Sequence, residues 1–391
     1  MNNIPILINN VKLQRCVETT KLSADIDGID LWFDFPLAIN VERRGEVFIA
    51  ATLLEAMLTA RDIHLCDELA ISSMLMTNLN TLQDIYCAWN SALHKVKVVA
   101  PNISEPTKFC NEASFFSGGI DSSYTLAKHN DTISHLIFLK GFDEEQSENE
   151  WSNAIEKHSN LAKKLDKKLV AINSNIREFI NAKKISNVFQ HGLTLGSLAS
   201  ILGFSKVYIP SSFTYSYLAP WGSHSLTDRL WGNSNAQIIH DGLEAKRSCK
   251  TTFLYAHKLL LDNIQVCWAS TEYNCGVCNK CVRTGLVLLL SKQKSKALPP
   301  LTNLKLLNVL APSGERSLHD FHDLIEFSQQ HNAPKVTIRL KSILWRYQVK
   351  YNLVELIKLL GGNYIKTWLH KLRKTQWSTA RITMTTGNKN N

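Results

Sequence analysis

The residues with the clearest chemical potential form one short string, Phe115-Phe116-Ser117-Gly118-Gly119-Ile120-Asp121-Ser122-Ser123. It follows an apolar segment typical of a short strand and opens a segment with helical spacing. Two adjacent glycines let the backbone approach a ligand closely and adopt dihedral angles that other residues avoid. The first turn of a helix adds unpaired N–H groups and a partial positive charge. The string therefore predicts a loop that binds the phosphates of a nucleotide.

Each polar residue of this loop has an expected role. Hydroxyl donors come from three serines, and Asp121 can hold the loop in shape or help to place Mg²⁺. The alternative is an ordinary Gly-Gly turn with Asp-Ser as a helix cap, but the full string at a strand-to-helix junction favours the phosphate loop. The chain has no Gly-Lys-Ser/Thr and no Gly-x-Gly-x-x-Gly spacing, so it is neither a Walker A loop nor a dinucleotide fingerprint. We expect nucleotide contacts from Ser117, Gly118, Gly119, Ile120, Asp121, Ser122 and Ser123, with Asp121 and Ser122 also catalytic.

A second candidate site is a cluster of cysteines. Four of the nine cysteines lie within fifteen positions: Cys267, Cys275, Cys278 and Cys281. Four thiolates complete the tetrahedral shell of Zn²⁺ and leave no open position, which is typical of a structural site. An iron–sulfur cluster or buried free cysteines are the alternatives. An odd count with one tight cluster indicates a metal site in a reducing compartment and not a disulfide framework.

Substrate contacts are expected mainly from residues 211–247, a long segment rich in Ser, Trp, Tyr, Gly and His. Its aromatic rings could stack on a planar base, and its charged groups could bind a carboxylate or phosphate. The alternative is a surface loop with satisfied polar groups. The expected substrate residues are His191, Trp221, His224, Asp228, Trp231, His240, Asp241 and Glu244.

Three cations complete the candidate site. Arg247 and Lys250 could neutralise charge that develops at an activated carboxyl group, so we expect both to be catalytic. Arg177 follows the third expected strand, where α/β proteins bind ligands, and is a candidate nucleotide contact.

The elements that must position these residues alternate between strand and helix. Short apolar strands are expected at 113–116, 135–139, 169–172 and 206–210. Helical spacing is found between them, at 122–129, 147–165 and 193–202. This alternation predicts an α/β fold, Rossmann-like, with a parallel sheet and helices on both faces.

The chain divides into four expected parts. An α+β domain spans 1–105, with a strand at 29–35 and helices at 47–60 and 81–92, and it ends in a proline-marked stretch. The nucleotide-binding domain with the zinc site spans 106–295, a helical basic extension spans 296–377, and 378–391 is expected to be disordered. There is no apolar run of eighteen residues and no signal-peptide pattern, so we expect a cytoplasmic protein with no membrane insertion.

Positive charge is concentrated in the last part of the chain. The formal net charge is +10, and from Lys335 to the end 12 Lys and Arg face a single acid, Glu355. A basic tail predicts an acidic partner such as a nucleic acid, an acidic protein face or a membrane surface; the alternative is a solvated helical face. We expect a small-molecule substrate at the main site and a protein or nucleic acid at the extension.

The string from Ser117 to Ser122 resembles the PP-loop of the ATP pyrophosphatase superfamily. The resemblance implies cleavage of ATP between its α and β phosphates, with Mg²⁺, and transfer of AMP to a substrate oxygen. A nucleophile, often ammonia or sulfur, then displaces AMP. The loop would hold the β and γ phosphates, where fixed donors and a metal ion stabilise the leaving group.

The order of motifs narrows the resemblance. A phosphate loop followed by Cys267-Trp268 and then by Cys275-Gly276-Val277-Cys278-Asn279-Lys280-Cys281 is similar to QueC, the 7-cyano-7-deazaguanine synthase family of queuosine biosynthesis. The similarity covers roughly residues 112–290. It implies a zinc site after the nucleotide-binding sheet, and conversion of a carboxy-deazapurine to an amide and then a nitrile with ammonia and ATP.

This chain departs from the QueC pattern in three places. It has about a hundred residues before the loop and another hundred after the zinc site, and the segment from Trp221 to Trp231 stands where the QueC substrate segment would be. The longer QueC-like proteins of bacterial antiviral operons and natural-product clusters fit this pattern better than the housekeeping enzymes.

Three functions are consistent with these features. The first is a QueC-like, C–N bond-forming ligase that adenylates a deazapurine-like acid. The second is an RNA-modifying PP-loop enzyme, which the basic tail favours and the lack of a recognisable RNA-binding module disfavours. The third is a non-catalytic nucleotide-binding subunit, which the intact loop disfavours.

Overall fold

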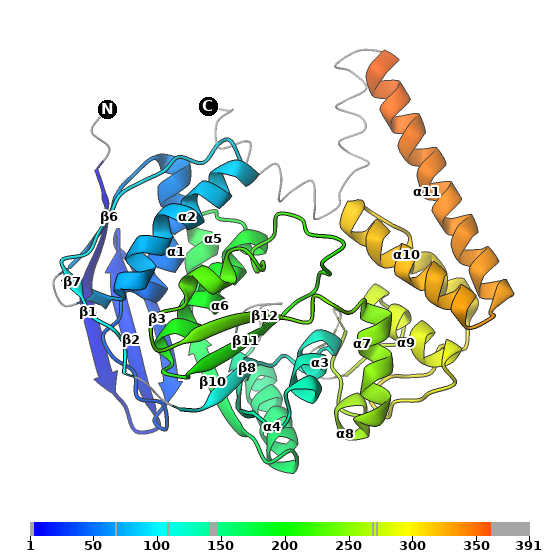
Figure 1. The fold of residues 1–391 in the computed structure, drawn as a ribbon, viewed down its shortest axis with the longest axis horizontal. Coiled ribbons are helices and arrows are strands. Elements are labelled where there is room, and N and C mark those ends of the chain that lie inside the picture. The colour runs from blue at the N-terminus through cyan, green and yellow to red at the C-terminus, as the bar shows by residue number, and fades with distance from the viewer. Residues whose placement is uncertain are drawn as a thin grey trace.

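A ten-stranded sheet organises the computed structural model, which describes residues 4–66, 69–107, 110–140, 147–267, 270 and 273–360. The strand order is β12-β11-β8-β9-β10-β3-β2-β1-β4-β6 (Figure 1). A second, two-stranded sheet pairs β5 (Ala70–Ile71) with β7 (Asn102–Ile103). The predicted α/β class, with a large and mostly parallel sheet flanked by helices, is confirmed.

Five parallel strands form the half of the sheet that carries the phosphate loop. They are β8 (Glu112–Phe115), β9 (Ile133–Leu139), β10 (Lys168–Ser174), β11 (Lys206–Pro210) and β12 (Gln237–Asp241). The first of them in the chain, β8, lies in the middle: β9 and β10 extend the sheet on one side, and β11 and β12 on the other. The winding therefore reverses between β8 and β11, and such a switch point opens a crevice at the carboxyl ends of the strands.

Helices cover both faces of this half. The chain runs through α3 (Ile120–Lys128) and α4 (Glu148–Lys164) between β8, β9 and β10, and through α5 (Ile176–Ala182) and α6 (Asn187–Ile201) between β10 and β11. Successive strand residues point to opposite faces, and the core divides accordingly: Val207 and Ile209 pack with α6, whereas Tyr208 packs with α3 and α4. Strands buried on both faces explain the continuous apolar runs in the sequence.

The N-terminal unit extends the same sheet with three antiparallel strands, β3, β2 and β1, and then with β4 and β6, which pair in parallel. It comprises β1 (Ile6–Arg15), β2 (Thr19–Ile26), β3 (Ile29–Pro36), α1 (Glu46–Thr59), β4 (Ile63–Leu65), α2 (Ser73–Trp89) and β6 (Val98–Val99). The strand β3 pairs with β10, and the side chain of Asn175 accepts from Trp32 N (2.8 Å) and donates to the carbonyl of Asp30 (2.8 Å). The sheet is thus continuous across residue 105. The division of the chain into domains at the expected limits stays a prediction.

Several elements agree with the expected positions, and others were not expected. The strand at 29–35 and the first helix at 47–60 match β3 and α1 within one residue. The long strands β1 and β2, and the edge strand β12 inside the segment expected to be a loop, have no counterpart among the expected elements.

The C-terminal part is a helical layer. It contains α7 (Arg247–Phe253), η2 (Leu254–Ala256), α8 (Lys258–Leu261), α9 (Asn279–Leu290), η3 (Leu304–Leu310), α10 (Glu315–Gln330) and α11 (Pro334–Leu360). A separate apolar core joins α9, η3, α10 and the first part of α11. The remainder of α11 extends away from the body (Figure 1). Residues 361–391, which include the end of the expected basic extension and the whole of the tail expected to be disordered at 378–391, lie outside the described residues. No helix within the described ranges is long and apolar enough to cross a membrane.

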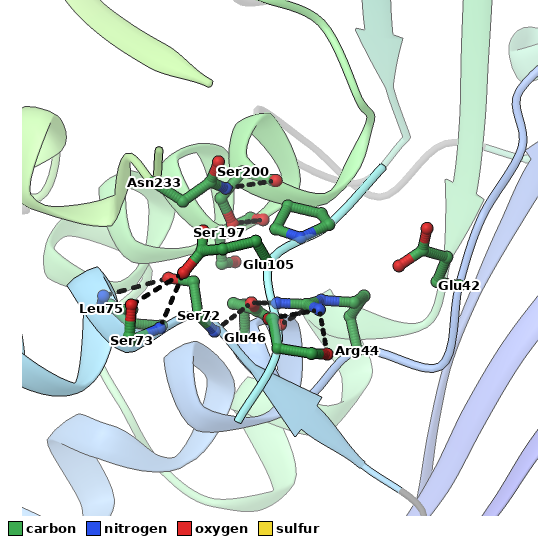
Figure 2. Close-up of polar contacts among 12 residues, drawn as sticks. Glu42, Arg44, Glu46, Ser72, Ser73, Leu75, Glu105, Ser197, Ser200 and Asn233 are labelled. Carbon is green, nitrogen blue, oxygen red and sulfur yellow. Dashed lines mark hydrogen bonds and ion pairs between the residues drawn. The ribbon is translucent and has the colours of Figure 1, made fainter. Parts of the chain in front are cut away.

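A buried ion pair fixes α1 and α2 to the segment that leads into β8 (Figure 2). Arg44 and Glu46, whose side chains are 1% and 0% exposed, pair with each other, and Arg44 also donates to the carbonyl of Ser104 (2.9 Å). Glu46 accepts from Ser72 N (3.1 Å). Burial raises the pKa of Glu46 despite the attraction of Arg44, so the carboxylate depends on its cation. Beside them, Glu105 accepts from the backbone N–H (3.0 Å) and hydroxyl (2.9 Å) of Ser73 at the start of α2.

Replacing only one member of this pair should destabilise the protein strongly. Arg44→Met leaves the Glu46 carboxylate buried without a cation, and we expect a loss of about 3–5 kcal/mol in the free energy of unfolding. The double variant Arg44→Met/Glu46→Met removes both charges and should recover a large part of that loss. Urea titration of the two variants measures the difference. Equal stability of Arg44→Met and the wild type would contradict a role for the pair.

Candidate functional site

The glycine-rich loop joins β8 to α3 at the carboxyl edge of the sheet. Gly118 has a φ of +73°, a conformation that favours glycine, and Gly119 is the N-cap of α3 without a side-chain cap. The first N–H groups of α3 therefore keep their donor capacity for a ligand. Ser122 Oγ donates to the carbonyl of Gly119 (3.2 Å) and lies 3.4 Å from Ser117 Oγ. The two hydroxyls thus lie together at the mouth of the loop.

Contacts from distant segments hold Gly118 in place. Its carbonyl accepts from Gln265 N (2.8 Å), and the side chain of Gln265 accepts from Lys157 Nζ (3.0 Å). A Cβ at Gly118 would lie 3.0 Å from Cε1 of His158, closer than an ordinary contact. Both the backbone angle and the available space thus require glycine here.

The buried imidazole of His158 packs against aromatic residues next to the loop. The ring of His158 lies against Phe116 (centroids 5.5 Å apart) and Phe138 (4.3 Å). Burial, followed by the charge of Lys157, lowers the pKa of His158 from 6.5 to about 4. The side chain is therefore a neutral, mostly apolar support at physiological pH.

The low pKa of His158 predicts a pH-dependent stability. Between about 6.5 and 4 the unfolded chain binds a proton that the folded chain does not, so stability should fall as pH falls through this window, by on the order of 2–3 kcal/mol. His158→Leu should reduce this dependence, whereas His94→Gln, at an exposed position, should keep it. Denaturant titrations at several pH values test this. An unchanged pH dependence in His158→Leu would show that the imidazole is not responsible.

Asp121 is held between two cations of α7. Its carboxylate lies 2.5 Å from Arg247 Nη1 and 3.2 Å from Lys250 Nζ. Burial of the Asp121 side chain, which is 18% exposed, opposes ionisation, but the attraction of Arg247 and Lys250 outweighs it and lowers the pKa to about 2. Asp121 is therefore ionised at any physiological pH. Both oxygens face cations, so the carboxylate holds the loop in shape and does not present a free ligand to Mg²⁺.

The two cations are themselves fixed to neighbouring elements. Lys250, only 2% exposed, donates to the carbonyl of Ser211 (2.6 Å), directly after β11. In α7, Ser248 donates through its N–H (3.0 Å) and hydroxyl (2.5 Å) to Asp323 of α10. The expected catalytic residues Asp121, Ser122, Arg247 and Lys250 are thus on adjacent elements at the β8/β11 switch point.

The four clustered cysteines form a potential metal site. Their sulfur atoms all lie within 4.8 Å of one another, with Cys267 Sγ 3.9 Å from Cys278 Sγ and Cys275 Sγ 4.0 Å from Cys281 Sγ. These separations are far above the roughly 2.05 Å of a disulfide. They approach the ~3.8 Å edge of a tetrahedron with Zn–S bonds of about 2.3 Å. The cluster can therefore bind a metal ion such as zinc. Trp268, part of the quoted motif, lies outside the described residues.

The residues around the cysteines hold the backbone of the cluster in place. Buried Asn274 accepts from Val266 N (2.8 Å) and Cys267 N (3.1 Å), and so sets the approach of the first cysteine. Gly276 has a φ of +74°, which permits the tight turn. Cys281 lies in the first turn of α9, where burial and the neighbouring thiols raise its pKa. A bound divalent cation reverses that effect because it stabilises the thiolate form.

Zinc should be bound by the purified protein and should support its stability. We expect about one zinc ion per chain. The Cys278→Ser variant should bind no zinc and should melt at a lower temperature. The cysteines precede and begin α9, which packs on α7 and shares an apolar core with η3, α10 and α11. Cys249→Ser, at an exposed cysteine outside the cluster, is the matched control and should retain the zinc and the wild-type melting temperature. Metal analysis and thermal unfolding of the wild type and the two variants test this prediction. A full metal content in Cys278→Ser, or iron in place of zinc in the wild type, would contradict the assignment of a structural zinc site.

Four of the expected substrate residues belong to one hydrogen-bonded network. Asp228 Oδ2 accepts from Ser223 Oγ (2.6 Å) and lies 2.7 Å from His240 Nδ1. His224 donates its N–H to Asp228 Oδ1 (3.0 Å), and His191 Nε2 accepts from Ser223 N (3.2 Å). These four expected substrate residues thus form one connected network that shapes the loop.

Other expected residues of the segment pack against the body. Trp231 is 1% exposed, and a Cβ at Gly196 of α6 would lie 2.5 Å from its ring. Asp241 accepts from Thr125 Oγ1 (2.8 Å), and Glu244 accepts from Tyr124 Oη (2.8 Å), so both carboxylates fix α3.

Trp221 and Arg177 have different surroundings. The half-buried ring of Trp221 contacts Phe213 (centroids 5.8 Å apart) and lies beneath Arg316 of α10, which is 4.0 Å from its centroid. Arg177 is in the first turn of α5, after β10, and β9 separates that strand from β8. Of the residues around the site, sequence reasoning missed His158, Gln265 and Arg316, which come from positions far apart in the chain.

The described part of the basic extension, residues 296–360, ends in α11. The outer half of this helix exposes Trp345 (64% exposed), together with Arg346 and Lys350.

Together these features define an α/β protein with a glycine loop that leads into a helix at the switch point of its sheet. A four-cysteine cluster and a helical layer lie in the C-terminal part of the chain. A comparison of the chain with protein-family models, with curated proteins and with solved structures gives no match.

Proposed function

We propose that this protein is an ATP-dependent, AMP-forming enzyme of the PP-loop type. It activates a carboxylate or amide oxygen of a deazapurine-like acid and then joins a nitrogen nucleophile to the activated carbon, as QueC-like enzymes do, in a specialised modification or antiviral pathway. The observation that carries the proposal is the convergence of Gly118, Gly119 and Asp121 with Arg247 and Lys250 at the β8/β11 switch point.

The loop residues are suited to the leaving pyrophosphate. The uncapped N–H groups of α3 and the hydroxyls of Ser117 and Ser122 supply donors on one side. ATP enters with Mg²⁺ on its phosphates, and together they supply the activating group. Arg247 and Lys250 would lie beside the phosphate that is attacked, where their charge stabilises the transition state.

Asp121 is a positioning residue in this proposal. It holds Arg247 and Lys250 against the loop, and its low pKa keeps the three charges paired over the whole physiological range. The cysteine cluster, with zinc bound, would have a structural role, since four thiolates leave no coordination position for a substrate.

An RNA-modifying enzyme with the same activation step is the second candidate. The exposed Trp345, Arg346 and Lys350 of α11 favour it, because aromatic and cationic side chains together bind nucleic acids. A non-catalytic nucleotide-binding subunit would share the loop but release no AMP.

Pyrophosphate release distinguishes these functions. Zinc-loaded protein with MgATP should release pyrophosphate and AMP when a carboxy-deazapurine and ammonium are added, or when tRNA is added if the second candidate holds. Asp121→Ala should lower the rate by about 100-fold or more, because it leaves Lys250 buried without its carboxylate and displaces both cations.

The matched control is Asp131→Ala, at an exposed position shortly after α3, which should retain the wild-type rate. Binding of MgATP without AMP formation with any acceptor would favour the non-catalytic subunit. A fully active Asp121→Ala variant would contradict the role of the clamp.

A further inference from the structure

An arginine of the C-terminal helical layer lies over the aromatic part of the site without an anionic partner. The guanidinium carbon of Arg316 is 4.0 Å from the ring centroid of Trp221 and 4.8 Å from that of Phe213. Within the described residues, this half-buried side chain forms no hydrogen bond and no ion pair. A guanidinium that rests on aromatic faces keeps its in-plane N–H groups for a ligand.

Neighbouring carboxylates do not explain its position. Asp320, four residues further along α10, is placed for a pair with Arg316, yet it binds Arg283 of α9 at 2.6 Å. Asp121 is occupied by Arg247 and Lys250. These two carboxylates therefore pair with Arg247, Lys250 and Arg283, and neither forms an ion pair with Arg316 in the described part of the chain.

Arg316 is linked to the phosphate loop through the segment that follows β11. Phe213, beneath the guanidinium, is two residues from Ser211, whose carbonyl accepts from Lys250 (2.6 Å). Lys250 in turn pairs with Asp121 (3.2 Å). Burial lowers the pKa of the Arg316 guanidinium.

The hydroxyl of Tyr217, whose ring stacks on His319 of α10 (centroids 4.7 Å apart), is buried without a hydrogen-bond partner in the described chain. The ring of Tyr217 also contacts Phe213 (centroids 5.7 Å apart), one of the two rings beneath Arg316, so this hydroxyl is a second polar group in the same aromatic cluster.

We propose that Arg316, resting on Trp221 and Phe213, is an oxyanion-binding residue that the C-terminal helical layer adds to the site, where it binds a carboxylate or phosphate of a ligand held against the phosphate loop. This deepens the proposed function and rests on it for the identity of the ligand. Two sources share this chemistry: the carboxylate of an aromatic acceptor and a phosphate of the nucleotide. A planar fork of N–H donors suits either group through two parallel hydrogen bonds.

Calorimetric titration of the full-length, zinc-loaded protein tests the proposal. The probes are MgATP, a carboxy-deazapurine, indole-3-carboxylate, and indole-3-carboxamide as the uncharged analogue. Arg316→Gln should weaken binding of one oxyanion class by about tenfold or more. Arg316→Lys, which keeps the charge but loses the planar fork, should give a smaller loss. Binding of the carboxamide should not depend on Arg316.

The matched control is Arg15→Gln at the end of β1, an exposed arginine of the N-terminal unit, and it should bind as the wild type does. A loss for the aromatic acids assigns Arg316 to the acceptor, and a loss for MgATP assigns it to the nucleotide. Wild-type affinity of Arg316→Gln for every probe overturns the proposal, and so does a wild-type protein that binds none of the oxyanions.

The experiments distinguish failure of the oxyanion site from failure of the proposed function. If the wild type binds aromatic acids through Arg316 but never binds MgATP, the oxyanion site stands and the ATP-dependent activity falls. If the wild type releases pyrophosphate while Arg316→Gln binds and reacts equally well, only the oxyanion site falls.

Discussion

The ionic contact between Asp121 and the two cations of α7 is the constraint on which the site depends. Lys250 is nearly inaccessible to water, so its charge can be kept only if a carboxylate and the carbonyl of Ser211 lie beside it. That contact joins the start of α3 to the end of β11 and to α7. The position of the glycine loop at the switch point and the position of the cations therefore depend on the same carboxylate.

The remaining architecture supports this contact from three directions. Gln265 and His158 contact Gly118 and hold it in place. The carboxylates of Asp241 and Glu244 accept hydrogen bonds from the C-terminal half of α3. The cysteine cluster orders the segment that leads into α9, and α9 packs on α7. Within the helical layer, Asp323 of α10 holds Ser248 of α7, and Arg316 of α10 lies on Trp221. The additional C-terminal helices thus lie beside the site.

The parts that could be predicted from sequence are those encoded locally. Buried parallel strands are short apolar runs separated by helical spacing, so β8, β9, β10 and β11 were recognisable, as were the glycine loop and the four cysteines. The strands β1 and β2 were not, because one antiparallel face meets solvent and their patterns contain many polar residues. The strand β12 was hidden within a segment whose polar and aromatic composition is typical of a loop.

Sequence reasoning could not determine which polar and aromatic side chains face a ligand. Trp231 and Trp221 have similar neighbours in the sequence, but the first fills the space above Gly196 and the second lies beneath Arg316. His158 and Gln265 reach Gly118 from distant parts of the chain, and such contacts leave no local signal. Arg316 lies in a helix with an ordinary amphipathic pattern, and only its placement in three dimensions distinguishes it.

A crystal structure of the zinc-loaded protein with Mg²⁺ and α,β-methylene ATP, which resists cleavage between the α and β phosphates, tests the central claim most directly. The β and γ phosphates are predicted to lie within hydrogen-bonding distance of the backbone N–H groups between Gly118 and Ser122, with Arg247 and Lys250 still paired with Asp121. A nucleotide bound elsewhere, or a loop that stays empty at saturating nucleotide, would contradict it.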